Sequence, residues 1–369
     1  MRIERIEVVP LEVPLSRTFH GSYYSMSARA TLITRVYTDS GLVGESYNGD
    51  EVHSQLDIAR VITQEIAPKL SGLDPTMVEA RWQEMLPLTF DILRDRRLVL
   101  MAMAAVDSAL WDLVGKAADM PLYRMWGGAS SELPIIAIGG YYRQSDADLA
   151  AEVEAYLEMG IGGCKMKVGA ATPEEDARRF IAMRRAASGE PFTLMADANQ
   201  GYSVSDAIAF ARLVADHDLR WFEEPVRWTE ADVWMRDVKN KTGVRVAAGQ
   251  SETARSDVRR LLEIGAIDVC NFDASWSGGP TEWRRVAGLA AAYGVEMAHH
   301  EEPQIAAHLL ASVHHGTYVE VFHPDRDPIF WNLIANRQPI EGGTYQVPAG
   351  PGLGLVLDEG FVERYRVDG

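Results

Sequence analysis

Beyond residue 126, short apolar runs alternate with longer segments of helical periodicity. Segments 203–216 and 230–241 repeat apolar residues every three to four positions, which is typical of amphipathic helices. Strands and helices in alternation predict βαβ units and a parallel sheet. Eight candidate strands suit a (β/α) barrel of the TIM type, whose active site lies at the carboxyl ends of its strands. These runs span 134–142, 163–168, 193–199, 219–225, 244–250, 268–274, 295–300 and 317–322.

The first 125 residues follow a different pattern, which predicts an α+β capping domain. A strand is expected near 2–13, followed by a hairpin that turns at Asp39-Ser40-Gly41. We expect domain boundaries at 1–125 for the capping domain and 126–344 for the barrel. The C-terminal segment 345–369 is expected to return to the capping domain. Helical patterns cover 52–69, 75–88 and 97–118.

Two lysines on one candidate strand give the first indication of chemistry. Lys165 and Lys167 are two positions apart, so they point to the same face of the strand. Because each ammonium disfavours the other, we predict a lowered pKa for at least one of them. A lysine with a lowered pKa can act as a base near neutral pH. A solvent-facing lysine pair on an edge strand is the alternative.

Carboxylates end the next three strands, at Asp197, Glu223 and Glu252. One carboxylate in such a place could cap a helix. Three at successive strand ends, on the side of the barrel where the lysines lie, favour an active site.

The last three strands add a candidate acid–base group. Asp273 and His300 end adjacent strands, where the carboxylate would orient the imidazole and raise its basicity. A histidine beside another histidine is more often a capping or packing residue, and this alternative stays open. Glu320 lies within an apolar run, and a buried carboxylate tends to stay protonated and to donate a hydrogen bond.

Together these motifs resemble the enolase superfamily, and within it the mandelate racemase-like subgroup, over essentially the whole chain. The resemblance implies a modified TIM barrel of the (β/α)7β type with an N-terminal α+β capping domain. It is carried by Ala105 to Asp112, Lys165-Met166-Lys167, Asp197-Ala198-Asn199, Glu223-Glu224-Pro225, Asp273 with His300, Ala307 to Leu310, Glu320 and Pro351 to Gly354.

The resemblance also implies roles for single residues. Asp197 and Glu223 match ligands of Mg²⁺, and Lys167 matches the base on one face of the substrate. His300, supported by Asp273, matches the acid or base on the opposite face.

Three further positions match groups that contact the substrate. Lys165 matches the residue that binds the substrate carboxylate, Glu320 the group that hydrogen-bonds the developing enolate, and Asn199 another substrate contact. The third metal ligand departs from the subgroup, because Gln250 stands where a glutamate is usual. We favour Glu252 as this ligand, since it has the same facing if the strand continues, with the amide oxygen of Gln250 as the alternative.

A polar segment at residues 14–24 is the candidate lid over the barrel mouth. Its Gly and Ser content suits a mobile loop, and a plain surface loop is the alternative. Side chains that can hydrogen-bond a polyol favour a sugar acid as substrate; they are Arg17, His20, Tyr23 and Tyr24.

The net charge limits the classes of binding partner, and the cysteine content indicates the cellular compartment. The net charge of -17 over 369 residues argues against nucleic acid and anionic membranes as partners. The two cysteines, Cys164 and Cys270, lie on predicted strands, which favours a reducing cytoplasm. A signal peptide and a membrane span are not expected, and the resembled family is generally oligomeric, so we expect a homo-oligomer.

The expected reaction is abstraction of the α-proton of a hydroxy carboxylate to give an Mg²⁺-stabilised enediolate. Dehydration of an aldonic or aldaric acid to a 2-keto-3-deoxy acid is the favoured outcome. A racemase, epimerase or sugar-lactone cycloisomerase would use the same site. A non-catalytic metal-binding protein is a further alternative, supported only by Gln250.

Overall fold

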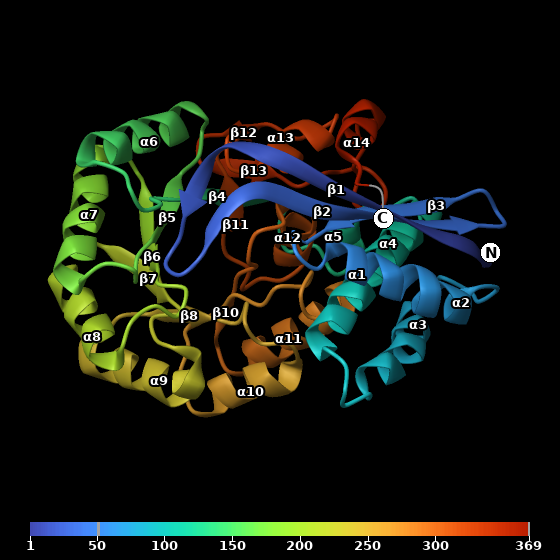
Figure 1. Cartoon of the computed structure of the whole chain (residues 1–369), viewed down its shortest axis with the longest axis horizontal. Helices are drawn as coiled ribbons and strands as arrows, with labels where there is room; N and C mark the ends of the chain where they lie inside the picture. The colour runs from blue at the N-terminus through green and yellow to red at the C-terminus, as the bar shows by residue number, and fades with distance from the viewer. Residues whose placement is uncertain (50–51, 368–369) are drawn as a thin grey trace.

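The computed structural model describes residues 1–49 and 52–367. An antiparallel sheet with helices, built from the N-terminal part of the chain, lies beside a barrel of parallel strands (Figure 1). The barrel strands are β4 (Glu132–Gly139), β5 (Gly163–Lys167), β6 (Thr193–Asp197), β7 (Leu219–Glu223), β8 (Val246–Ala248), β9 (Val269–Cys270), β10 (Glu296–Met297) and β11 (Val319–Phe322).

Seven helices connect these eight strands, so the predicted (β/α)7β barrel is confirmed. Parallel pairing runs from β4 through β10, and β11 closes the barrel by pairing with β4. The Thr317 N–H donates to the Met297 carbonyl at 2.9 Å, which ties the segment before β11 to β10. The helices are α6 (Asp146–Glu158), α7 (Pro173–Ala186), α8 (Val204–Leu213), α9 (Ala231–Thr242, preceded by the 3-10 turn η3, Trp228–Glu230), α10 (Arg255–Glu263), α11 (Pro280–Ala292) and α12 (Pro303–Ala311).

Alternation along each strand divides the side chains between two apolar layers. Cys164 and Met166 face outward into the large core between the strands and the helices, and Lys165 and Lys167 therefore face inward. A separate inner cluster, which includes Trp221, fills the barrel beneath the strand ends. The two lysines thus project above a packed apolar floor.

The N-terminal unit is a three-stranded sheet of order β1-β2-β3 covered by helices. Its strands are β1 (Ile3–His20), β2 (Ser25–Thr38) and β3 (Val43–Asn48), and β2 and β3 join at the predicted turn, where Gly41 has φ 82°. Its helices are α1 (Gln55–Val61), the π-helical η1 (Ile62–Ile66), α2 (Ala67–Leu70), α3 (Val78–Met85), the 3-10 turn η2 (Leu86–Thr89), α4 (Arg96–Ala117) and α5 (Leu122–Met125).

Strand β1 and helix α4 of this unit each have an unexpected length or composition. β1 does not end near residue 13 but continues to His20, so the candidate lid is the tip of the β1–β2 hairpin, which reaches over the barrel strands (Figure 1). α4 is long and apolar enough to cross a membrane, but it is 83% buried, which marks it as a core helix.

The C-terminal part packs against both units. It contains α13 (Pro328–Leu333), β12 (Ile340–Glu341), β13 (Thr344–Gln346) and α14 (Glu359–Tyr365). β13 pairs antiparallel with β4 of the barrel. On the other side, the Leu353 N–H donates to Asp112 of α4 at 2.8 Å, and the Val367 N–H donates to the Pro10 carbonyl at 2.9 Å. Residues 368–369 of the segment expected to return to the capping domain lie outside the described residues.

A buried aspartate of α4 ties the two units together. α11 begins after Gly279, which has no side chain to cap the helix, and Asp107 takes that role from the other unit. Its carboxylate accepts hydrogen bonds from the Thr281 N–H and hydroxyl, both at 2.8 Å. Gly279 has φ 91°, and a Cβ there would lie 2.5 Å from Asp107 Oδ2, so only glycine fits the junction.

Replacing Asp107 by alanine removes both hydrogen bonds and leaves the first turn of α11 uncapped. We expect the free energy of unfolding to fall by about 1–3 kcal/mol, the range for losing a cap and leaving a buried donor unsatisfied. Urea denaturation followed by circular dichroism measures this. Asp216→Ala, at an exposed turn, is the control and should change stability by less than about 0.5 kcal/mol. An Asp107→Ala protein as stable as the wild type would contradict the coupling.

Candidate active site

The carboxyl ends of β5, β6 and β7 bring the predicted lysines and carboxylates together. The strands pair with Lys167 beside Asp197 and with Asp197 beside Glu223. Lys167 Nζ lies 2.7 Å from Asp197 Oδ2, and Lys165 Nζ lies 2.6 Å from Glu223 Oε1. All four side chains are buried, so the ion pairs are shielded from water.

The predicted lowering of a lysine pKa is wrong for this arrangement. Burial lowers the pKa of Lys165, and Lys167 lowers it further, but Glu223, Glu320 and Asp197 outweigh both and raise it. Burial likewise lowers the pKa of Lys167, and Asp197 raises it well above its usual range. Sequence reasoning placed carboxylates on the side of the barrel where the lysines lie, but it did not show that they form direct ion pairs with them.

Glu320 accepts one hydrogen bond and forms an ion pair, which differs from the donor role expected from burial alone. Its Oε1 lies 2.5 Å from Lys165 Nζ, and its Oε2 accepts the Glu301 N–H at 2.9 Å. Three carboxyl groups in this cluster, Asp197, Glu223 and Glu320, therefore face two ammonium groups, and burial raises the pKa of Glu223 to about 7.

The donor set at the strand ends fits Mg²⁺. Asp197 and Glu223 supply carboxylate oxygens, and Gln250 supplies an amide oxygen that is buried and has no hydrogen-bond partner among the described residues. The Gln250 amide N–H donates to Glu224 Oε2 at 3.1 Å, which fixes the orientation of the amide. Within residues 1–49 and 52–367, no three His, Cys, Asp or Glu side chains are grouped to hold a metal, so a carboxylate-only site is not formed.

Gln250, and not Glu252, lines the cavity above the strand ends. β8 ends at Ala248 and a turn follows, so the alternation that would have aimed Glu252 into the site does not continue. Gln250 is therefore better placed than Glu252 to supply the third ligand.

The structure brings Asp273 and His300 together as predicted. His300 Nδ1 lies 2.9 Å from Asp273 Oδ2, and Asp273 Oδ1 accepts the Ser275 N–H at 2.7 Å. The Trp276 ring packs on the imidazole with its centroid 4.8 Å away. His299 accepts the Ala274 N–H instead, which gives the neighbouring histidine a structural role.

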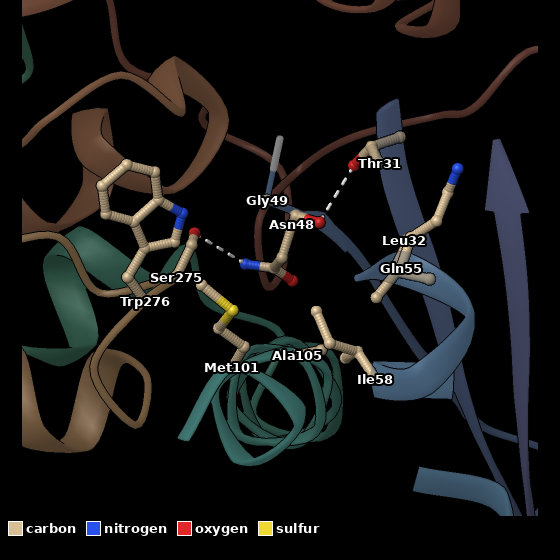
Figure 2. A pocket seen from close by; sticks show the side chains of 10 residues that line it. All are labelled: Thr31, Leu32, Asn48, Gly49, Gln55, Ile58, Met101, Ala105, Ser275 and Trp276. Atoms are coloured by element: carbon tan, nitrogen blue, oxygen red, sulfur yellow. Dashed lines mark hydrogen bonds between the residues drawn. The ribbon is translucent and has the colours of Figure 1, made fainter. Parts of the chain in front are cut away.

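A small pocket beside this loop shows how the N-terminal sheet supports the dyad (Figure 2). Asn48, at the end of β3, donates from its side-chain amide to Ser275 Oγ at 3.3 Å and to Ser108 Oγ at 3.2 Å. Thr31 of β2 donates to the Asn48 carbonyl at 3.1 Å. The barrel loop that carries Asp273 and Trp276 is thereby linked to the sheet of the N-terminal unit.

Sequence reasoning missed a second carboxylate at His300. Glu301 Oε1 lies 3.3 Å from His300 Nε2, and Glu301 Oε2 lies 2.8 Å from Arg29 Nη1. Burial lowers the pKa of His300, but Glu301 and Asp273 outweigh it and raise the pKa to about 10. An acidic residue directly after the strand-end histidine was the available signal, although Glu301-Glu302-Pro303 also suits a helix start.

A cavity of about 500 Å³ joins these groups under the β1–β2 hairpin. Lys167, Asn199 and His300 all line it, and Asn199 Oδ1 has no hydrogen-bond partner among the described residues. The other lining residues are Glu12, Tyr24, Ser25, Met26, Ser27, Ala28, Val52, His53, Gln250, Trp276, Glu301 and Arg326.

Of the four predicted lid residues, the structure places one in this cavity. The Tyr24 ring lies 5.8 Å from Lys167 Nζ. Tyr23 is 75% exposed, and Arg17 packs on Phe19. Neither of these two, nor His20, lines the cavity.

Ser22, which sequence reasoning passed over, anchors the hairpin tip. Its hydroxyl lies 2.7 Å from the Val168 carbonyl and 2.9 Å from the Ala198 carbonyl, just beyond β5 and β6. The hairpin is thereby fastened beside the lysines.

Comparisons with known proteins agree with the geometry. Residues 5–127 match the family described as mandelate racemase/muconate lactonizing enzyme, N-terminal domain, and residues 148–361 match enolase C-terminal domain-like. The chain is 31% identical to the 3,6-anhydro-alpha-L-galactonate cycloisomerase of Streptomyces coelicolor, over 96% of this chain and 97% of that protein. It is 28% identical to the arabinonate dehydratase of Saccharolobus solfataricus, over 90% of each.

A solved structure is similar over the whole chain. A mandelate racemase/muconate lactonizing enzyme from a marine actinobacterium, in complex with magnesium, superposes with a TM-score of 0.94 at 50% identity, covering 100% of this chain and 99% of that one.

Removing the amide of Gln250 should weaken Mg²⁺ binding, because one of three oxygen donors is lost. We expect Gln250→Ala to raise the dissociation constant roughly tenfold, about 1.4 kcal/mol, and Glu252→Ala to leave it unchanged. Isothermal titration calorimetry measures both, with the surface variant Gln83→Ala as control. The reverse result, in which only Glu252→Ala weakens binding, would assign the third ligand to Glu252.

Proposed function

The chain belongs to the mandelate racemase-like subgroup of the enolase superfamily, and from this premise we propose that it dehydrates an aldonic or aldaric acid to a 2-keto-3-deoxy acid. The observation that carries the proposal is the shared cavity, which Lys167 and a doubly carboxylate-flanked His300 both line. A base and an acid in one cavity are what removal of an α-proton and loss of a β-hydroxyl require.

The proposed roles divide the reaction between two sides of the cavity. Lys167 takes the α-proton in its neutral form; its contact with Asp197 favours the ammonium, and engagement of Asp197 by the metal would weaken that contact. His300, held by Asp273, gives a proton to the departing hydroxyl. Lys165 faces the substrate carboxylate, where a well-placed donor contributes roughly 3 kcal/mol to transition-state stabilisation. Glu320 holds the Lys165 ammonium in place. The free amide oxygen of Asn199 suits a substrate hydroxyl.

Asp197, Glu223 and Gln250 would hold Mg²⁺. When bound, the ion neutralises the charge that develops on the substrate carboxylate as the α-proton leaves.

The cavity wall supports a polyol as the rest of the substrate. Ser25, Ser27, Tyr24 and His53 offer hydrogen-bonding groups for hydroxyls, beside an apolar side of the wall formed by Met26, Ala28, Val52 and Trp276. This favours a sugar acid.

Cycloisomerisation of a sugar lactone is the second candidate, because a relative at 31% identity carries that name. Racemisation or epimerisation would use the same Lys167 and His300. A non-catalytic metal-binding protein is the weakest alternative, since the ion pairs of Lys167 and of His300 have no evident use in metal storage.

We also propose a cytoplasmic homo-oligomer. Both cysteines, Cys164 and Cys270, are buried and free, which suits a reducing compartment. Phe90, Ile92 and Leu93 are each at least 65% exposed at one loop, and contact between subunits would cover them.

Proton NMR in D₂O with Mg²⁺ and a panel of sugar acids tests the reaction. We expect one acid to give a 2-keto-3-deoxy product. Lys167→Ala should abolish both conversion and α-deuteration, and His300→Asn should slow water loss by about 10²–10⁴-fold while α-deuteration continues.

Three other results would contradict dehydration. Deuterium at the α-carbon without water loss indicates a racemase or epimerase. Conversion of a lactone without keto acid indicates a cycloisomerase. Bound Mg²⁺ with no exchange in any acid or lactone of a complete stereochemical panel indicates the non-catalytic protein.

A further inference from the structure

Glu301 is fixed at both ends in the wall of the cavity. Its carboxylate spans His300 Nε2 at 3.3 Å and Arg29 Nη1 at 2.8 Å, and its N–H donates to Glu320 Oε2 at 2.9 Å. Its side chain is only 12% exposed. Glu301 thus contacts the candidate acid, the N-terminal sheet and the carboxylate that neighbours Lys165.

The backbone at this point is strained in a way that serves the contact. Glu301 and Glu302 have φ 50° and 49°, although neither is glycine. A left-handed conformation is disfavoured for residues other than glycine, because the Cβ atom crowds the following carbonyl oxygen. Strain of this kind persists where surrounding contacts over-determine it, and it clusters at functional sites. Here it accompanies the return of the Glu301 carboxylate to the imidazole of the preceding residue.

Both ring nitrogens of His300 face a carboxylate. Asp273 is hydrogen-bonded to Nδ1 at 2.9 Å, and the Glu301 carboxylate lies 3.3 Å from Nε2 as an ion-pair partner. A carboxylate beside each ring nitrogen stabilises a proton on that nitrogen. The arrangement therefore favours the imidazolium. The charged and titratable groups that interact with His300 are Asp273 after β9, Glu224 after β7, and His299 and Glu301 on its own segment. Burial raises the pKa of Glu301, whereas His300 and two arginines, Arg29 of β2 and Arg326 after β11, lower it.

We propose that Glu301 is a positioning residue that keeps a proton on Nε2 of His300, so that His300 meets the substrate as an acid. This rests on the dehydratase function proposed above. Arg29 then holds Glu301 aside when the substrate hydroxyl takes its place at Nε2. A group held as an acid suits departure of a hydroxyl better than abstraction of a proton.

Every proton and electron pair in the proposed step has a source and a destination. The α-proton passes to Lys167 Nζ, and the electron pair of the broken C–H bond forms the Cα–Cβ double bond. The Cβ–O bond breaks, and the hydroxyl leaves as water with the Nε2 proton of His300. The enol tautomerises to the keto acid. Lys167 returns its proton to solvent, and His300 takes one from solvent beside Glu301.

Glu301→Gln tests the proposal, because the amide keeps the shape of the side chain but not its charge. The titration of the His300 ring is followed by ¹H–¹³C NMR of histidine-labelled protein with Mg²⁺ present, with the signal assigned by its loss in His300→Asn. We expect the midpoint of His300 to fall by roughly one pH unit or more. An unchanged midpoint overturns the proposal.

Glu302→Gln is the matched control. Glu302 is the next residue, has the same backbone strain and faces the same Arg29, at 3.5 Å, but makes no contact with the His300 ring. In Glu302→Gln, the titration midpoint of His300 should stay within about 0.3 pH units of the wild-type value. An equal fall in both variants would mean that the Arg29 network acts as a whole, and this also overturns the specific role of Glu301. Should Glu301→Gln not fold, Glu301→Asp, which withdraws the carboxylate from Nε2, takes its place in the same titration with the same criterion.

The activity readout separates this proposal from the proposed function. On a sugar acid that the wild type dehydrates, Glu301→Gln should shift the pH at which water loss declines, relative to α-deuteration, downward by the same unit or more, whereas Glu302→Gln should keep the wild-type pH profile. If the wild type dehydrates no acid, the dehydratase function is wrong, while the titration still decides whether Glu301 holds the proton.

Discussion

The buried ion pairs at the ends of β5, β6 and β7 constrain the rest of this structure. An ammonium group without a partner in an apolar interior is very costly, so Lys165 and Lys167 can face inward only if carboxylates meet them. Strand register supplies those partners, since Lys167, Asp197 and Glu223 lie side by side on neighbouring strands. The register in which the barrel strands pair therefore also sets which charged groups meet in the site.

A charged cluster of this kind also needs a cover, and the N-terminal unit provides it. Arg29 of β2 reaches Glu301, Glu302 and Asp327 beyond the barrel strands, so the sheet and the barrel mouth share buried charges. Asp107 makes the corresponding link at α11 with hydrogen bonds. The two units are joined through polar groups that neither satisfies alone, which holds the cavity between them in a defined shape.

Sequence periodicity predicted the barrel and most strand ends, because a parallel strand buried on both faces leaves a short apolar run whose polar terminus is visible. It also paired Asp273 with His300. What it could not show were contacts set by local backbone breaks. β8 stops at Ala248 and so redirects Glu252, and the left-handed turn at Glu301 brings a second carboxylate to His300. The prediction of a lowered lysine pKa was wrong for a related reason. Carboxylates on other strands raise the lysine pKa values by more than the neighbouring ammonium on the same strand lowers them.

The hairpin over the cavity is a continuous ribbon and not a loop. β1 and β2 stay paired from Ile3 to Pro14 and again at Phe19 and His20, and Ser22 fastens the tip. Because the chain is already ordered, opening the cavity costs little conformational entropy and is instead an elastic bend about the break after Pro14. If molecules enter the cavity by bending of this ribbon, a stiffer ribbon would slow their entry and exit without altering any group in the cavity.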